Sequence, residues 1–411
     1  MSICPTEYWL WLQCALGAGA KTDELLAYFG DPEKMYNAGS SEWRLSGLLT
    51  PKKINSLKSI SPSETGSIFR ECKSKGYSII TPDNVNYPER FKQLKDMPLA
   101  LYSLGDASVL KDSVSIGIVG TRNASNYGIE TAQKLSFALA SCGVTIVSGG
   151  ALGIDSEAHA GAMLAKGRTV AFLGCGLSFD YLKENASLRR AITKYGAVVS
   201  EFAPFTSASR TTFPIRNRLI SGLTLGTVVI EAGIKSGSLI TANYALEQGK
   251  DVFAVPGDIV RSSFDGANHL IKNGAKPVFS VMDILSEYEY LYGDLIDFSK
   301  ADVSLSQLPY VEYRKKSEKK ASQNTVVKKE IEKVKEKAKE EAKEEVKEKK
   351  ELDDSFSEDA KKVYSVLSEN PIHVDDILRK TALKMNDVLS ALTELEIMGE
   401  IVSAEGKKYK I

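Results

Sequence analysis

The chain has 411 residues, 43% of them hydrophobic, so it is long enough for two to four domains and apolar enough for a substantial core. Its formal charge is zero, with 53 basic and 53 acidic residues, so any nucleic-acid site must be a local basic patch. Five cysteines without CxxC spacing and three histidines give no pattern for structural zinc and fit reduced thiols in a cytosol. We therefore expect a cytoplasmic protein with no metal site and no other cofactor.

Residues 1–80 are predicted to form a small helical domain of the SAM or helix-hairpin-helix type. Apolar residues recur at helical spacing in 25–29, and a glycine and a proline end that segment. Glycine-containing turns at 16–19 and 45–49 separate the predicted helices. Such turns can present backbone N–H groups to a DNA phosphate, or they can be the ordinary turns of a helical cap.

The apolar stretch 8–20 has two interpretations, a secretory signal or a buried helix. No Lys or Arg precedes it, and Glu7 stands where a signal would have its basic region, so a buried helix is the better interpretation. No other apolar run approaches the roughly 20 residues that a membrane span needs, so we expect no contact with a membrane.

A Rossmann-like α/β domain is predicted over residues 81–300. Short runs rich in β-branched residues alternate there with helix-length segments, and the runs are 115–120, 145–147, 169–173, 197–199, 227–230 and 251–255. Continuous apolar strands that alternate with helices indicate a doubly wound, mostly parallel sheet covered on both faces. Ligands of such sheets bind outside the carboxyl ends of the strands.

Residues 301–354 are predicted to be a charged, low-complexity spacer. Between Arg314 and Glu351 there are 15 basic and 10 acidic residues, and Glu-to-Lys pairs recur at i, i+3, as in Glu332 and Lys335. The apolar seam is too thin to pack on a core, so we interpret the segment as a semi-rigid link that is helical at least in part. A DNA-binding tail is the alternative, and the interspersed glutamates argue against it.

Residues 355–411 are predicted to form a winged helix. Three helices are expected at 360–367, 374–378 and 388–395, followed by strands at 400–402 and 408–411. The predicted recognition helix carries Lys384 but also Asp387 and Glu394, which makes a poor surface for phosphates. A protein-interaction or structural role is therefore at least as well supported as DNA binding.

Four segments should converge at the carboxyl edge of the sheet, and the first three are loops that follow strands. In the first loop, Gly120 permits a close backbone approach, and Arg122 offers a guanidinium fork suited to a phosphate or a guanine edge. The second loop contains Ser148, Gly149 and Gly150, and paired glycines before a helix expose N–H groups where an anion is favoured.

The third loop, residues 233–241, combines Lys235 with a glycine and hydroxyl groups at a helix start. The fourth segment contains Arg216, Asn217 and Arg218, and two arginines so spaced cannot both point the same way from a helix. One of them can thus be structural, and burial in an ion pair with Asp155 or Glu201 is the alternative for each. Neither GxGxxG nor GxxxxGK[ST] is present, so no dinucleotide site or P-loop is predicted.

Taken together with the Ala-Val-Pro-Gly run at 254–257, these blocks resemble, in their order, the signature blocks of the DNA-processing protein A family, DprA or Smf. The resemblance is strong over about 85–285 and extends to the helical cap and the winged helix. It implies a non-enzymatic, dimeric protein that binds and protects single-stranded DNA and loads the RecA recombinase in natural transformation. No catalytic residue is assigned.

The resemblance also implies roles for particular residues. Arg122 matches the family's DNA-contacting arginine, Lys183 falls where the family carries a DNA-binding lysine, and Lys235 lies in a loop with further basic contacts. The family usually has proline at the position of Leu182, which leaves the local backbone less certain.

His269, Leu270 and Ile271 resemble the family's dimerisation segment. Helical geometry places Ala267, Leu270 and Ile271 on one face, and this face could instead pack on the sheet. We favour a two-fold interface between two copies of the chain.

Two other functions remain in view. Related Rossmann-like phosphoribohydrolases, which cleave nucleoside monophosphates, need a PGGxGTxxE loop; here 223–231 lacks the glycine pair, and Glu231 falls one residue late. The other alternative is an interaction scaffold that uses the spacer and the winged helix without binding DNA.

Overall fold

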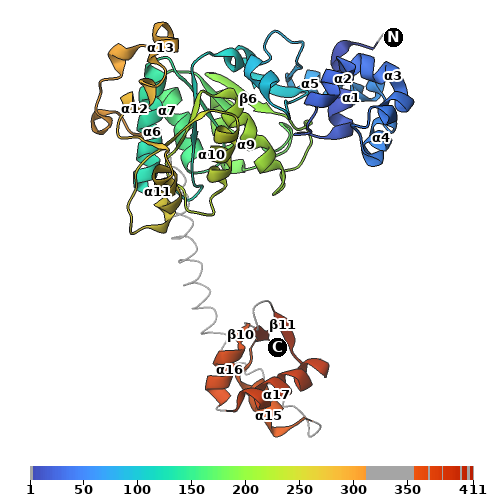
Figure 1. The fold of residues 1–411 in the computed structure, drawn as a ribbon. Coiled ribbons are helices and arrows are strands. Elements are labelled where there is room, and N and C mark those ends of the chain that lie inside the picture. The colour runs from blue at the N-terminus through green and yellow to red at the C-terminus, as the bar shows by residue number, and fades with distance from the viewer. Residues whose placement is uncertain are drawn as a thin grey trace. The chain divides into compact units, whose positions relative to one another are not determined.

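The computed structural model describes residues 3–311, 356–368, 371–381, 383–398, 400–404 and 408–410. The chain divides into two compact units, Met1–Val311 and Glu312–Ile411 (Figure 1). The predicted spacer lies outside the described residues from position 312 onward. Within the described ranges, no helix combines the length and the apolar character that crossing a membrane requires.

The first unit begins with five helices: α1 Pro5–Leu16, α2 Asp23–Phe29, α3 Pro32–Leu45, α4 Pro51–Lys58 and α5 Gly66–Lys75. The apolar stretch predicted to be a buried helix is α1, whose Trp11 is fully enclosed in a cluster with Met35 and Trp43. Both predicted turns contain glycines with positive φ, among them Gly19 and Gly47. The prediction of a helical N-terminal region is thereby confirmed.

One mixed sheet forms the centre of this unit. Its strands, all within residues 3–311, are β1 Ser78–Ile80, β2 Leu101–Gly105, β3 Ser115–Val119, β4 Thr145–Ser148, β5 Thr169–Phe172, β6 Gly196–Ser200, β7 Gly226–Val229, β8 Asp251–Ala254 and β9 Lys276–Pro277. Their order is β1-β2-β6-β5-β4-β3-β7-β8-β9, and only β1 and β2 run antiparallel to their neighbours. The six predicted strands are confirmed, whereas β1, β2 and β9 were not predicted.

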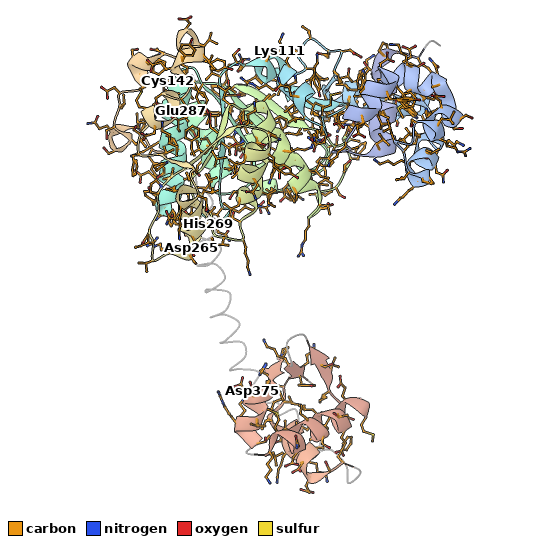
Figure 2. The ribbon with its side chains drawn as sticks, in the orientation of Figure 1. Lys111, Cys142, Asp265, His269, Glu287 and Asp375 are labelled. Carbon is orange, nitrogen blue, oxygen red and sulfur yellow. The ribbon has the colours of Figure 1, made fainter. Side chains whose placement is uncertain are left out.

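The strand order reverses direction between β3 and β7, which are paired in parallel. Chain segments that leave the carboxyl ends of these two strands go to opposite faces, and this opens a crevice at the switch point. In Figure 2, Lys111, which precedes β3, lies near the top of the first unit, and His269, which follows β8, lies near its bottom.

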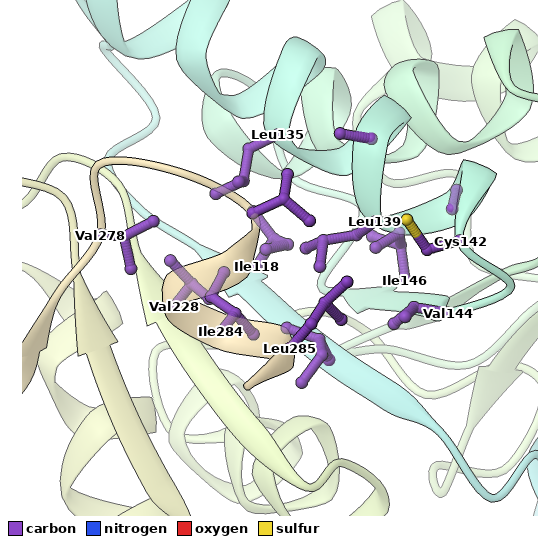
Figure 3. Packing of buried hydrophobic residues seen from close by; sticks show 14 of the residues in the cluster. Ile118, Leu135, Leu139, Cys142, Val144, Ile146, Val228, Val278, Ile284 and Leu285 are labelled. Carbon is purple, nitrogen blue, oxygen red and sulfur yellow. The ribbon is translucent and has the colours of Figure 1, made fainter. Parts of the chain in front are cut away.

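Helices cover both faces of the sheet. The remaining helices of the first unit are α6 Asn126–Ser141, α7 Ile154–Leu164, α8 Ala186–Ile192, α9 Thr212–Leu223, α10 Gly237–Glu247, α11 Asp265–Lys272, α12 Met282–Leu285 and α13 Glu289–Tyr292. Ile116 and Ile118 of β3 face the cluster under α6, α7 and α12 (Figure 3), while Val119 faces α9, α10 and α11. Alternate residues of one strand thus enter opposite cores.

The first unit extends past the predicted boundary at residue 300. Gln133 of α6 forms two hydrogen bonds with the backbone of Val311. Its Oε1 accepts from the Val311 N–H at 2.7 Å, and its Nε2 donates to the Val311 carbonyl at 3.0 Å. At the other predicted boundary, residue 80 is the last residue of β1. The division into helical and Rossmann-like domains stays a prediction.

The second unit has the predicted winged-helix elements. They are α15 Glu358–Val366, β10 Ile372–His373, α16 Val374–Thr381, α17 Met385–Ile397, β11 Val402–Ala404 and β12 Lys408–Lys410. The strands are antiparallel in the order β10-β12-β11. Val363, Ile377 and Leu392, one from each helix, meet in its core. Among the described residues of this unit, the short strand β10 is the one element that was not predicted.

Candidate functional site

A cavity of about 300 Å³ lies at the switch point, beside the carboxyl ends of β3 and β7. The predicted segments converge there, and the lining residues that carry the argument are 120–123, Ala151, Asp155, Phe213, Arg216, Asn217, Ser236 and Ser238. The cavity is therefore built from four stretches that are far apart in the sequence, as the strand pattern predicted.

Arg122 is the exposed cation of this cavity. Its guanidinium carbon lies 5.0 Å from the ring centroid of Phe213, within the range of a cation–π contact. The Phe213 ring in turn contacts Tyr181, with 5.5 Å between the ring centroids. A guanidinium over the Phe213 ring, which itself packs against Tyr181, places a group that can bind a phosphate beside an apolar surface.

Two glycines let the first and second loops lie against each other and so set the position of Arg122. A Cβ on Gly120 would come within 2.5 Å of the Ile154 side chain. Gly153 has φ +76°, and a Cβ there would lie 2.5 Å from the carbonyl oxygens of Thr121 and Arg122. Larger residues at either position would push the arginine loop away from the sheet.

Glu231, which follows β7, braces the same loop. Its Oε2 accepts hydrogen bonds from the backbone N–H of Ser125 at 2.9 Å and from the Ser125 hydroxyl at 2.7 Å, and its carbonyl accepts from the N–H of Thr121 at 2.8 Å. Ser125 also caps α6 by accepting from the N–H of Gly128 at 3.1 Å. Sequence reasoning considered Glu231 only for the phosphoribohydrolase alternative and missed this supporting role.

Ser148, Gly149 and Gly150 are buried beneath the cavity. The Ser148 hydroxyl donates to the carbonyl of Ile118 at 2.6 Å, and the Gly149 carbonyl accepts from Arg216 at 2.5 Å. These contacts make the three residues a support for the site, while their contact with DNA through backbone N–H groups stays a prediction.

The two arginines of α9 have different surroundings. Arg216 is 5% exposed, lines the cavity and donates to the backbone carbonyls of Gly149 and Phe172. Burial raises the pKa of the nearby Asp155 carboxyl, and the positive charge of Arg216 opposes that rise. The prediction that Arg216 belongs to the site agrees with this position, although its hydrogen bonds go to protein carbonyls.

Arg218 has the structural role that was the alternative for each arginine. Its Nη2 lies 2.8 Å and 2.9 Å from the two carboxylate oxygens of Glu201, and its Nε lies 3.1 Å from Asp96. Burial raises the pKa of the Glu201 carboxyl, and the positive charge of Arg218 opposes that rise. Arg218 is not among the residues that line the cavity, so its predicted DNA contact is corrected to a buried ion pair.

Glu201 also binds the first glycine turn, because its carboxylate accepts a hydrogen bond from the N–H of Gly19 at 3.0 Å. The turn that could have presented this N–H to a phosphate instead presents it to a carboxylate of the sheet. The ordinary-turn interpretation therefore holds for Gly19, and the contact joins the helical region to the sheet.

Asn217, Lys235 and Lys183 complete the predicted set. Asn217 lines the cavity and connects two segments, because its Oδ1 accepts from Arg216 at 3.1 Å and its Nδ2 donates to the Gly237 carbonyl at 3.3 Å. Lys235 is exposed and directly precedes Ser236, which lines the cavity. Lys183 is exposed after β5 and lies 3.4 Å from Asp180, outside the cavity lining.

The backbone before Lys183 departs from the family pattern. Leu182 has φ +49°, a left-handed conformation that a proline ring cannot adopt. The segment is tied to the second loop by Asn185, which donates to the Gly150 carbonyl at 3.1 Å. Lys183 thus lies at the same sheet edge as Arg122, on a backbone that a proline would not reproduce.

The predicted dimerisation segment forms α11. Ala267 is fully buried, Leu270 and Ile271 are half-buried against the core on the α9–α10 face, and His269 is exposed. Packing on the sheet therefore accounts for Ala267 and for part of the other two apolar side chains. In the described part of the chain, no group of His, Cys, Asp and Glu side chains could hold a metal ion.

Comparison with known proteins places these observations in a family. A family model described as DNA recombination-mediator protein A matches residues 78–289, and a DprA winged helix domain matches residues 347–407. The chain is 41% identical over 215 residues to the DNA processing protein DprA of Bacillus subtilis, and the matched stretch covers 52% of this chain and 72% of that protein. It is 32% identical over 345 residues to Protein Smf of Synechocystis, and this match covers 83% of this chain and 82% of that protein.

A solved structure is also similar. The X-ray structure of DNA processing protein A from Streptococcus pneumoniae matches with a TM-score of 0.60 and 32% sequence identity, and the match covers 70% of this chain and 99% of that chain. The sequence blocks and the sheet topology therefore lead to the same relatives.

Proposed function

The chain belongs to the DNA processing protein A (DprA/Smf) family, and we propose that it binds single-stranded DNA at the carboxyl edge of its sheet. The observation that carries the proposal is the exposed Arg122 guanidinium stacked on Phe213 at the mouth of the switch-point cavity. Aromatic faces stack on unpaired bases, and cations pair with phosphates, which is how single strands are bound without sequence reading.

The finer proposal concerns what the bound strand is for. By the family resemblance, the protein protects incoming single strands and loads RecA onto them during natural transformation, as a homodimer in the cytoplasm. All five cysteines are free, which supports a reducing compartment. The half-buried apolar residues of α11 supply a surface that a second copy would cover.

We further propose a binding protein without catalytic activity. The phosphoribohydrolase alternative needs a carboxylate that reaches a ligand, and Glu231 is 1% exposed with its Oε2 engaged by Ser125. Asp155, the acid that does line the cavity, lies under Arg216 and is 7% exposed. Both acids therefore support the shape and charge of the site.

Fluorescence anisotropy with single- and double-stranded oligonucleotides across a salt series tests the proposal. Single strands should bind more tightly than duplexes, and affinity should fall with salt because phosphate contacts release counterions. Lys183→Ala should reduce the salt slope by about 0.7 if one single-strand phosphate contact is lost. Equal affinity for both forms would contradict the proposal, and release of free base from a nucleoside monophosphate would favour the enzyme instead.

A further inference from the structure

Two phenylalanine rings are exposed on the loops that follow β5 and β6, beyond the cavity already described. Phe205 is 68% exposed and Phe179 is 37% exposed. We propose that these two rings, the β5–β6 aromatic surface, stack on further unpaired bases of the strand that enters the cavity. The proposal rests on the proposed function and extends its site to a second place on the sheet edge.

The loops that carry the rings are braced. The N–H of Gly176 donates to the Thr206 carbonyl at 2.8 Å, and the N–H of Ser178 donates to the Pro204 carbonyl at 2.8 Å. The Ser178 hydroxyl also donates to Glu71 of α5 at 2.8 Å. Because their backbones are held, the two loops can present their rings to a ligand at a small further cost in conformational entropy.

The β5–β6 aromatic surface lies along the same edge of the sheet as the cavity. β3, β4, β5 and β6 are neighbours in the sheet and run in parallel, so the loops after their carboxyl ends lie along one edge. With strands about 4.8 Å apart, the loop after β6 begins about 14 Å from the loop that carries Arg122. Tyr181, which contacts Phe213 in the cavity wall, is two residues after Phe179 and links the two places.

The charges beside the rings fit the backbone of a nucleic acid. Lys183 follows Phe179 on one loop, and its side chain is 81% exposed. Arg210 follows Phe205 on the other loop and is also exposed. Rings interleaved with cations along a single edge match a strand whose bases stack and whose phosphates alternate with them. We therefore assign the surface to DNA bases.

The test is the dependence of affinity on strand length. Oligothymidines from about 4 to about 16 nucleotides span the site sizes of known single-strand binding folds. For the full chain, Phe205→Ala should leave the shortest oligomers unaffected and weaken the longer ones by about five- to tenfold, the loss of one stacked base. Phe205→Tyr keeps a ring and should restore wild-type affinity. Tyr290→Ala is the control, because Tyr290 is 96% exposed on α13, at the opposite edge of the unit (Figure 1).

A second measurement separates stacking from a general disturbance. In long oligomers whose bases are replaced by abasic sites, wild type and Phe205→Ala should bind equally, since there is nothing left to stack. Unchanged affinity of Phe205→Ala at every length, or an equal loss at every length, would overturn the proposal. Arg122→Ala should weaken binding at all lengths. If it does so while Phe205→Ala has no effect, the proposed function stands and the assignment of the β5–β6 aromatic surface is wrong. If neither variant changes binding, the proposed site itself is wrong.

Discussion

The carboxyl edge of the sheet and the recognition helix of the winged helix are both surfaces of a kind that binds DNA, yet they differ in chemistry. The sheet edge exposes Arg122, Lys183 and Lys235. The helix α17 contains no Lys or Arg, and it exposes Met385 and Leu389. A fold alone does not assign a function, and here the exposed side chains favour the first unit for the proposed DNA binding.

The acids of α17 are also used within the second unit. Glu394 accepts from the N–H of Ser357 at 2.8 Å and from its hydroxyl at 2.6 Å, and Glu396 accepts from Ser403 at 2.6 Å. These carboxylates hold the start of α15 and strand β11 while they keep the helix surface negative. The comparison therefore supports a structural or protein-binding role for the winged helix.

The largest expected effect concerns stability and separates the two units. Arg218→Ala leaves Glu201 and Asp96 without their cation, and breaking a buried ion pair costs about 3–5 kcal/mol. Thermal unfolding should show the transition of the first unit at a much lower temperature and that of the second unit unchanged. The matched control, Arg379→Ala, removes an exposed partner of Asp376 in the winged helix and should shift neither transition. An unchanged first transition would contradict the structural role of Arg218.

The next effect concerns affinity. Arg122→Ala should weaken single-strand binding by roughly 1.5–3 kcal/mol, the range for a hydrogen bond to a charged group. Lys384→Ala, which removes the basic residue at the start of α17, should leave affinity unchanged. Anisotropy titrations at one salt concentration measure both variants. A larger loss from Lys384→Ala than from Arg122→Ala would reverse the comparison between the two regions.

A smaller effect tests assembly. Ile271→Glu places like charges together if α11 meets α11 of a second copy, so the dimer should dissociate and long strands should bind about tenfold more weakly through lost avidity. Asn273→Glu adds the same charge at an exposed neighbour and is the matched control. Light scattering gives the mass and circular dichroism the fold. A dimer of unchanged mass places the interface elsewhere, whereas a monomer that has lost its fold shows that Ile271 belongs to the core.

The smallest effect concerns the link between the two regions. Deleting 328–350 should change single-strand affinity by no more than about twofold at moderate salt, well below the 1.4 kcal/mol of a tenfold change. The expectation follows from the mixed charge of the segment, in which glutamates alternate with lysines. A tenfold loss in the same anisotropy assay would show that the segment itself contacts DNA.

What the sequence could predict depended on local signals. Runs of β-branched residues predicted the six strands β3 to β8, whereas β9 has only two residues, Lys276 and Pro277, and offers no period to detect. The spacing of Arg216 and Arg218 predicted different directions for the two side chains. Which of them is fixed in an ion pair depended on Glu201, which comes to α9 through the packing of the sheet.

The site was predicted in part for the same reason. Gly149 and Gly150 have the composition of an anion-binding loop, but both are buried and their carbonyls accept from Arg216 and Asn185, which no local pattern predicts. The stack of Arg122, Phe213 and Tyr181 also joins three distant segments. Such contacts belong to tertiary structure and become visible only once the chain is folded.

Hydrogen–deuterium exchange of the full chain, with and without a single-stranded oligonucleotide, tests the assignment of DNA to the first unit most directly. Bound DNA should slow the exchange of backbone amides in the loops 120–125 and 233–241, which flank the cavity, and leave α17 unchanged. Protection confined to α17, with both loops exchanging as in the free protein, would contradict the account.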